Sequence, residues 1–295
     1  MITGQLKRII ELQSLQQDSV NNKSNICAVV SGKGGTGKTI FSIRVSNFLA
    51  KKKRKILLVD LDINLANIHF LLNETPLKSL NNYFNQHEDL QNIITEYSDN
   101  LHIIYGLNSY SIADIPFKSS IDNLLKDIQL LSGKYDFVIL DLGAGLGELT
   151  MKALQIAAIK IIISIPEATS VMDAYAVIKM FENYYKPSEF KIVMNRCLQK
   201  SDGLESFNKL AKAVTSFLKS SVNLLTTINE SKELRHSVAE QTLISKEDFE
   251  DNSKSEFVLA AEEIDKYIHL TNINQPSKSS LFTTSKNISK SSFIL

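Results

Sequence analysis

Short apolar runs alternate with longer amphipathic stretches along most of this chain. The apolar runs are continuous, which is typical of strands in a parallel sheet that helices cover on both faces. The amphipathic stretches between them predict helices. We expect strands at 26–30, 56–59, 101–105, 137–140, 159–165 and 191–194, and helices at 39–51, 121–131, 171–185 and 204–218. This alternation predicts a doubly wound α/β fold with a mostly parallel sheet and helices on both faces.

The two ends of the chain differ in pattern from this body. Residues 1–25 read as a short amphipathic helix followed by a polar linker, and residues 26–270 as one folded domain. Residues 271–295 are rich in Ser, Thr and Asn and contain lysines but no acidic residue. Such a composition cannot bury a core, so we expect a disordered cationic tail.

Charge and cysteine content exclude several classes of protein. The 295 residues include 33 basic and 32 acidic ones, which argues against holding nucleic acid by bulk electrostatics. Two distant cysteines, Cys27 and Cys197, exclude a disulfide scaffold, and the five histidines have no metal-binding spacing. No apolar run is long enough for a membrane span and no signal peptide is evident, so we expect a cytoplasmic protein. The basic run 51–55 ends a predicted helix, where solvent and the helix dipole favour cations.

A glycine-rich segment directly follows the first predicted strand. Its sequence, G-K-G-G-T-G-K-T, fits the phosphate-binding pattern G-x-x-x-x-G-K-[ST], with a helix after it as that pattern requires. Backbone N–H groups of such a loop converge on phosphate, and the helix N-terminus adds positive potential. Lys38 would contact the β- and γ-phosphates and Thr39 would offer its hydroxyl to Mg²⁺. The predicted nucleotide-binding residues are Gly32, Lys33, Gly34, Gly35, Thr36, Gly37, Lys38 and Thr39.

Carboxylates follow two other predicted strands. Asp60 and Asp62 end the second strand and Asp141 ends the fourth. Ligands of an open parallel sheet bind at the carboxyl ends of its strands, so these acids should face the phosphate loop. Three glycines at 143–147 follow Asp141, and we expect this segment to move when the γ-phosphate is lost.

Lys33, a second lysine within the loop, makes the segment resemble the deviant Walker A motif of the MinD/ParA family of P-loop ATPases. The D-x-D-x-x-x-A-N sequence at 60–67 resembles the switch I segment of that family. The D-x-G-A-G sequence at 141–145 and the block 165–179, I-P-E-A-T-S-V-M-D-A-Y-A-V-I-K, resemble the FlhG/FleN branch of flagellar number regulators. The resemblance covers roughly residues 26–245 and identifies this segment as a P-loop ATPase domain.

The resemblance implies a role for each of these residues. Lys33 would reach the partner's nucleotide in an ATP-bound dimer, and Asp62 would orient the attacking water, so that Lys33, Lys38 and Asp62 form the catalytic set. The backbone N–H of Gly143 would sense the γ-phosphate. Mg²⁺ would be held by Thr39, Asp60 and Asp141. In V-M-N-R, the amide of Asn195 would read the adenine, with Arg196 beside it.

The implied function is an ATP-dependent dimerising switch that regulates flagellar number or placement through partner binding. Hydrolysis of ATP, with Mg²⁺ as cofactor, would be slow and stimulated by the partner. Besides the homodimer, the implied partners are an FlhF-like GTPase, flagellar switch or C-ring proteins, and a flagellar transcription regulator; no specific nucleic acid is expected.

Both ends depart from the pattern of that branch. Only Gln5, Leu6 and Ile9 remain of the N-terminal FlhF-activating motif, and Ile10 stands where arginine would be. The tail has Phe282, Phe293, Ile294 and Leu295 among serines, which predicts weak contact with the inner face of the cell membrane.

Other functions remain open at this point. A MinD-like division-site or ParA-like partition ATPase shares the P-loop but not the D-x-G-A-G and D-A-Y blocks. A metabolic kinase or a bacterial P-loop tyrosine kinase is another possibility, although the latter would have a tyrosine cluster in its tail, where nothing beyond Tyr267 occurs. A pseudo-ATPase that only binds nucleotide is a third, against which the intact Lys38, Thr39, Asp62 and Asp141 argue. An iron–sulfur carrier needs paired loop cysteines, whereas Cys27 falls in a predicted strand.

Overall fold

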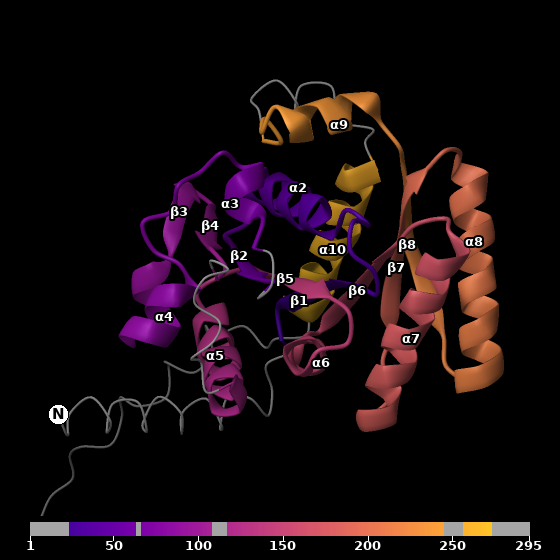
Figure 1. Cartoon of the computed structure of the whole chain (residues 1–295), viewed down its shortest axis with the longest axis horizontal. Helices are drawn as coiled ribbons and strands as arrows, with labels where there is room; N and C mark the ends of the chain where they lie inside the picture. The colour runs from indigo at the N-terminus through magenta and orange to yellow at the C-terminus, as the bar shows by residue number, and fades with distance from the viewer. Residues whose placement is uncertain (1–23, 63–65, 108–116, 245–255, 273–295) are drawn as a thin grey trace, which may run out of the picture.

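The computed structural model describes residues 24–62, 66–107, 117–244 and 256–272. Within them an eight-stranded sheet has the order β3-β4-β2-β5-β1-β6-β7-β8 (Figure 1). Only β3 is antiparallel to its neighbour. The strands are β1 Ile26–Ser31, β2 Ile56–Leu61, β3 Thr95–Ser98, β4 Leu101–Ile104, β5 Phe137–Ala144, β6 Ile159–Ser164, β7 Phe190–Cys197 and β8 Val222–Asn229.

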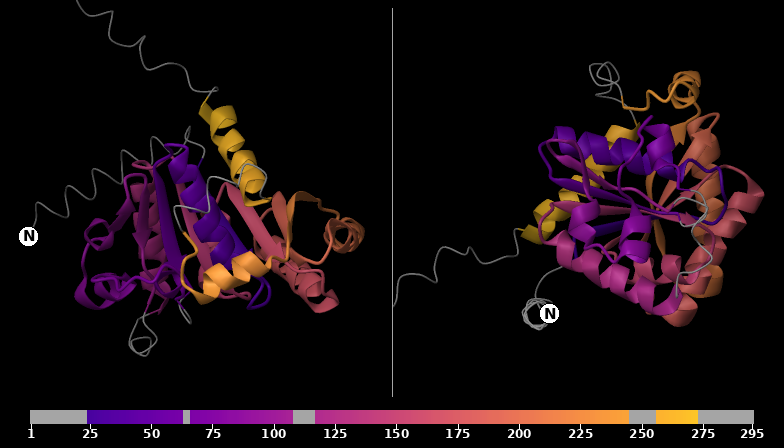
Figure 2. Two further views of the ribbon diagram at one scale, coloured as in Figure 1. Left: turned by 90° about the horizontal axis from the view of Figure 1, so that it is seen from above. Right: turned by 60° about the vertical axis from the view of Figure 1, so that its left-hand side comes forward.

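Helices cover both faces of this sheet (Figures 1 and 2). They are α2 Lys38–Lys51, α3 Ile68–Leu71, α4 Leu80–Gln86, α5 Phe117–Ser132, α6 Glu148–Ile156, α7 Ala168–Tyr184, α8 Lys200–Ala213, α9 Lys232–Ala239 and α10 Glu256–Asn272, with a 3₁₀ turn at Leu90–Ile93 and a π-helical turn at Val214–Leu218. No described helix is both long and apolar enough to cross a bilayer. The doubly wound α/β fold predicted from the apolar runs is confirmed.

Alternate residues of each central strand belong to two separate hydrophobic cores. In β1, Ile26, Ala28 and Val30 pack with α5 to α8, whereas Cys27 and Val29 pack with α2 and α10. Successive strand side chains point to opposite faces, so a strand covered on both sides must be apolar at every position. This is why the predicted strands appear in the sequence as continuous runs.

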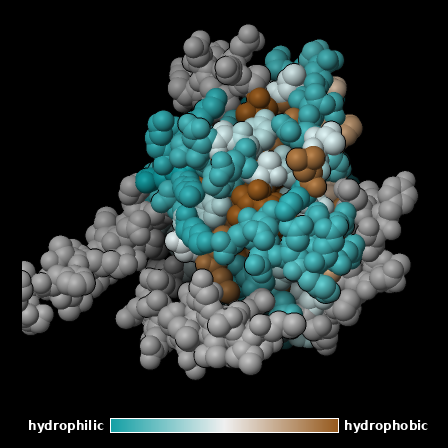
Figure 3. Space-filling view, turned by 90° about the vertical axis from the view of Figure 1, so that its left-hand side faces the viewer, coloured by the Kyte–Doolittle hydropathy of each residue, from teal (hydrophilic) through white to brown (hydrophobic). Residues whose placement is uncertain are grey.

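The differences from the predicted elements lie at the edges of the fold. The edge strands β3 and β8 were not predicted, because β3 alternates between half-buried and exposed positions and β8 carries polar residues among its apolar ones. The face of the molecule at the β3 end of the sheet is mostly hydrophilic, with small separate hydrophobic areas (Figure 3). Helix α10 was also missed, although its Phe257 packs on Phe41 of α2 in the second core.

The basic run at 51–55 lies at the end of α2, as expected, and most of its side chains are exposed. Two of its cations also pair with α10: Lys52 Nζ lies 3.1 Å from Glu262 and Arg54 Nε 2.7 Å from Asp265. The predicted N-terminal helix at 1–25 and the tail at 271–295 fall almost wholly outside the described residues.

The first prediction concerns the contact of α8 with the sheet. A Cβ on Gly203 would lie 2.7 Å from Cys197 Sγ and 2.8 Å from Thr227 Cγ2. We expect Gly203→Ala to destabilise the protein by about 1–2 kcal/mol in urea unfolding, because overpacking outweighs the gain in helix propensity. The matched control is Gly133→Ala, whose Cβ would have its nearest neighbour at 3.9 Å. Equal stability of the two variants would contradict this packing.

The second prediction concerns Lys160, a buried lysine on β6. Its Nζ donates to the carbonyl of Ala157 at 2.8 Å and lies 5.7 Å from the ring centre of Phe181. Burial lowers the pKa of Lys160 below the ordinary value of 10.5, so keeping it charged costs stability at neutral pH. That cost is lost as the pH rises toward 10.5. We expect the unfolding free energy of Lys160→Met to exceed that of the parent most at pH 7 and the difference to shrink by pH 10. A pH-independent difference would contradict this.

Candidate functional site

The glycine-rich loop connects β1 to α2 at the carboxyl end of the central strands. Gly35 and Gly37 have φ angles of 78° and 90°, a left-handed conformation that side chains disfavour. The loop is fixed from β1, since Ser31 Oγ donates to the carbonyl of Lys33 at 2.9 Å. The strand, loop and helix therefore have the arrangement that phosphate binding requires.

The end of strand β7 and helix α7 hold this loop by close contacts. The amide of Asn195, at the end of β7, donates to the carbonyl of Thr36 at 2.7 Å. A Cβ on Gly37 would lie 2.3 Å from that same amide nitrogen, so glycine is required for space as well as for φ. A Cβ on Gly32 would lie 2.5 Å from the backbone of Asp173 in α7. The loop is thus packed against both β7 and α7.

Asp141 is the buried carboxylate beside the loop. Its Oδ1 accepts from Ser42 Oγ at 2.9 Å and lies 3.3 Å from Lys38 Nζ, which in turn lies 3.4 Å from the Thr39 hydroxyl oxygen. Burial nevertheless raises the pKa of Asp141 above its ordinary value. Oδ2 is buried without a hydrogen-bond partner among the described residues.

This arrangement fits a magnesium ion. A buried carboxylate oxygen without a partner beside a threonine hydroxyl is a suitable donor set, because Mg²⁺ in phosphate sites takes few protein ligands. Thr39 and Asp141 are therefore the residues that would hold the ion.

Asp60 lies next to Asp141 in the parallel register of β2 and β5. Its two carboxylate oxygens accept from the backbone N–H groups of Asp62 at 3.1 Å and Ile68 at 3.2 Å. Burial and the charge of Asp141 raise the pKa of Asp60 to about 7. Asp60 thus anchors both ends of the switch I segment, and a bound cation would favour its ionised form.

Asp62 lies between the phosphate loop and the second glycine segment. Its Oδ2 is 3.9 Å from Lys38 Nζ, and a Cβ on Gly143 would lie 3.3 Å from its Oδ1. The side chain is 17% exposed, so it can meet solvent and ligand. The structure therefore brings Lys38, Asp62 and Gly143 together at the carboxyl edge of the sheet, where the strands before them end.

Lys33 and Arg196 lie at the rim. Lys33 Nζ pairs with Glu167 Oε2 at 2.9 Å, and both side chains are about half exposed. Arg196 is exposed, has a φ of 55° and pairs with Glu230 at 3.2 Å. Arg196 thus points to solvent, whereas the adjacent Asn195 is buried against the loop.

Sequence reasoning missed four residues of this site: Ser42, Gly106, Glu167 and Asp173. Ser42 had a signal, because a residue four positions after Lys38 lies on the same face of the helix. Gly106 follows β4, and a Cβ there would lie 3.0 Å from Asp60 Cγ. The contacts of Glu167 and Asp173 join segments more than 130 positions apart, which no local pattern indicates.

Comparison with known proteins agrees with this geometry. The profile of the AAA domain family (AAA_31) matches residues 24–194, which is more than half of the chain. The chain belongs to this family. Its relatives and structural neighbours place it among the MinD/ParA ATPases, close to the FlhG/FleN proteins, as the motifs predicted.

Two bacterial relatives span most of this MinD/ParA-type ATPase. The antiactivator FleN of Pseudomonas aeruginosa is 26% identical over 221 residues, which cover 74% of this chain and 78% of FleN. The flagellum site-determining protein YlxH of Helicobacter pylori is 28% identical over 251 residues, which cover 83% and 84% of the two chains. The septum site-determining protein MinD of Pyrococcus horikoshii, solved with Mg-ADP, has a TM-score of 0.65 at 25% identity and covers 84% of this chain and 99% of its own.

The third prediction tests the hold of β7 on the phosphate loop of this ATPase. Asn195→Ala removes a buried hydrogen bond to the carbonyl of Thr36. We expect ATP binding to weaken about five- to ten-fold, measured by fluorescent-nucleotide titration, because the loop loses its fixed geometry. Arg196→Asn, which tolerates the positive φ, is the matched control and should bind ATP like the parent. A comparable loss in the control would instead indicate that Arg196 contacts the nucleotide.

Proposed function

We propose that this ATPase is an ATP-dependent dimerising switch that regulates flagellar number or placement by binding partners. The observation that carries the proposal is the joint presence of Lys33 at the rim and of two relatives that span most of the chain, FleN and the flagellum site-determining protein YlxH. The ATPase fold and the residues of the nucleotide site support the part of the proposal that concerns ATP hydrolysis. The flagellar part rests on those relatives and on the blocks 141–145 and 165–179.

In the proposed reaction, water attacks the γ-phosphate in line, and each side chain has a defined task. Lys38 neutralises charge that develops on the phosphate oxygens, and Asp62, within reach of Lys38, orients the water. The backbone N–H of Gly143 contacts the γ-phosphate and so couples its loss to the segment 143–147. Mg²⁺, held through Thr39 and Asp141 with Asp60 behind them, would supply positive charge to the phosphates.

Lys33 provides the link between ATP and dimerisation in this proposal. Its side chain is about half exposed, and among the described residues its ammonium group pairs with Glu167. An exposed ion pair contributes at most about 1 kcal/mol, so Lys33 can leave Glu167 when a phosphate of a second subunit is offered. The proposed hydrolysis is slow until a partner binds, and loss of the γ-phosphate returns the monomers.

The proposed partners are an FlhF-like GTPase, flagellar switch or C-ring proteins and a flagellar transcription regulator. The amide of Asn195 is proposed to lie near the base of the nucleotide, with Arg196 beside it at the rim and without contact to the base. The protein is proposed to work in the cytoplasm with weak contact to the inner face of the membrane. A division-site or partition role is the second candidate, which the structural likeness to MinD favours.

The fourth prediction separates binding from hydrolysis. In Asp62→Ala the water is no longer oriented, so we expect ATP binding to persist while turnover falls by about 100-fold or more. The ATP-bound dimer should then accumulate, as measured by light scattering after gel filtration. Lys33→Ala is the control variant: it should bind ATP yet remain monomeric. An ATP-bound Asp62→Ala protein that runs as a monomer would contradict the proposal.

A further inference from the structure

Helices α7 and α8 end beside each other at the side of the sheet away from the nucleotide site. They lie side by side (Figure 1), and α7 also contacts the π-helical turn that ends α8. Because each helix connects two parallel strands, both run in the same direction. From Asp173, which touches the phosphate loop at Gly32, the last residue of α7, Tyr184, is about 16 Å away along the helix.

The π-helical turn at Val214–Leu218 turns an aromatic side chain toward solvent. The buried side of α8 continues through Leu210 to Val214. In an unbroken α-helix the next position on this side would be Phe217, seven residues after Leu210. The extra residue of the wider turn brings Leu218 against the core in its place and leaves Phe217 77% exposed. Turns of this kind occur frequently at functional sites.

A second aromatic side chain and three cations lie near Phe217 at these helix ends. Tyr184 is 73% exposed. Lys186, Lys212 and Lys219 are exposed and form no ion pair with any residue that the structure describes. We call these five residues the aromatic–lysine surface.

Nearby groups leave the positive charge of this surface in place. Glu182 is only partly exposed and forms no ion pair within the described part of the chain, and Glu189 pairs with Lys191 at 3.2 Å. Lys219 Nζ donates to the neutral carbonyl of Ser216 at 3.2 Å. The surface therefore presents exposed aromatic rings among uncompensated cations, and a complementary ligand is both apolar and anionic.

A protein segment fits this chemistry better than a lipid bilayer does. Aromatic side chains surrounded by charged ones are typical of protein–protein interfaces, where the aromatic rings contribute most of the affinity. Recognition of anionic lipids commonly uses clusters of about four to eight lysines or arginines, whereas the aromatic–lysine surface has three.

We propose that the aromatic–lysine surface binds an acidic amphipathic helix of a partner protein. The apolar face of that helix covers Tyr184 and Phe217, and its carboxylates pair with the three lysines. This inference rests on the proposed function only in that it requires a protein partner; it requires no flagellar role and no contact with the nucleotide.

The experiment uses a fluorescent reporter in the full chain. The sequence contains no tryptophan, so Tyr184→Trp places a single one in the surface. This protein, saturated with Mg-ADP, is titrated with a synthetic helical peptide of about 18 residues that has leucines on one face and glutamates on the other. Two control peptides replace the glutamates with lysines or the leucines with serines. We expect a saturable blue shift of the emission with the first peptide alone.

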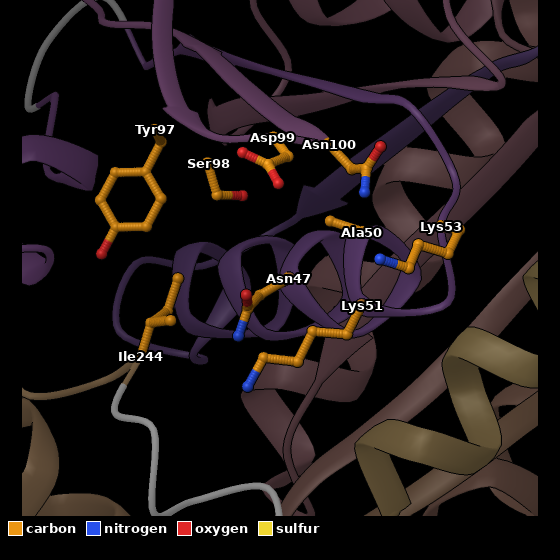
Figure 4. A pocket seen from close by; sticks show the side chains of 9 residues that line it. All are labelled: Asn47, Ala50, Lys51, Lys53, Tyr97, Ser98, Asp99, Asn100 and Ile244. Carbon is orange, nitrogen blue, oxygen red and sulfur yellow. The ribbon is translucent and has the colours of Figure 1, made fainter.

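Variants of the reporter protein locate the contact. Phe217→Ser should weaken peptide binding about ten-fold, whereas Leu77→Ser, which changes a side chain 97% exposed elsewhere, should leave it unchanged. Lys219→Asn removes a cation at a φ of 57°, which asparagine tolerates, and should weaken binding about three-fold. Its matched control is Lys53→Asn, at a φ of 65° beside the cavity at the end of α2 (Figure 4), which should bind like the parent. Fluorescent-nucleotide binding equal to that of the parent shows that each variant is folded.

Several results would overturn the proposal. One is an unchanged emission with the acidic peptide up to about 1 mM. Another is equal weakening by Lys219→Asn and Lys53→Asn, which would show diffuse attraction to cations. Full binding by Phe217→Ser would remove the aromatic contact. Vesicles of phosphatidylglycerol and phosphatidylcholine are titrated in parallel, and a blue shift with vesicles but not with the peptide would identify a membrane-binding surface instead. None of these outcomes decides the proposed ATP-dependent dimerisation, which Asp62→Ala and Lys33→Ala test separately.

Discussion

Asp60 and Asp141 occupy neighbouring positions on two parallel strands, and both carboxylates are almost completely buried. Burial makes the charged form of each carboxylate less stable, and repulsion between the two charges adds to this cost. Each carboxylate must therefore be stabilised by hydrogen bonds or a positive charge near the carboxyl ends of β2 and β5. Lys38 and Ser42, both on α2, supply it for Asp141, and two backbone N–H groups of switch I supply it for Asp60. The position of α2 and the course of switch I thus both depend on this pair of acids.

This dependence explains how a phosphate can be sensed. The ammonium group of Lys38 lies near Asp141 and Asp62, so a triphosphate that attracts Lys38 changes the electrostatic environment of both acids. Asp62 in turn lies beside Gly143, since a Cβ built on that glycine would be 3.3 Å from Asp62 Oδ1. In the function proposed above, the γ-phosphate would therefore reach both segments through direct contacts, without a long chain of intermediates.

Most of this arrangement can be predicted from the sequence, because it follows from patterns within short segments of the chain. Continuous apolar runs reveal strands covered on both faces, and an acid after such a run falls at the ligand-binding edge of the sheet. What it could not predict involves pairs that are distant along the chain. The approach of Asp173 to Gly32 and the bond from Asn195 to Thr36 depend on how α7 and β7 dock. Strands β3 and β8 were missed because an edge strand is half solvated and loses the continuous pattern.

The helix α2 joins these local and distant constraints. Its first residue, Lys38, lies beside Asp141. The basic run at its other end forms ion pairs with α10 through Lys52 and Arg54. Phe41 in its first half packs on Phe257, so α10 contacts the helix along its length and not only at the ion pairs. A helix fixed by packing at several points moves as a rigid rod, if it moves at all. Any displacement of Lys38 along the helix axis must therefore be accompanied by adjustment of α10, whereas rotation of the Lys38 side chain requires none. The structure consequently favours side-chain and loop motion, rather than helix motion, as the response to nucleotide.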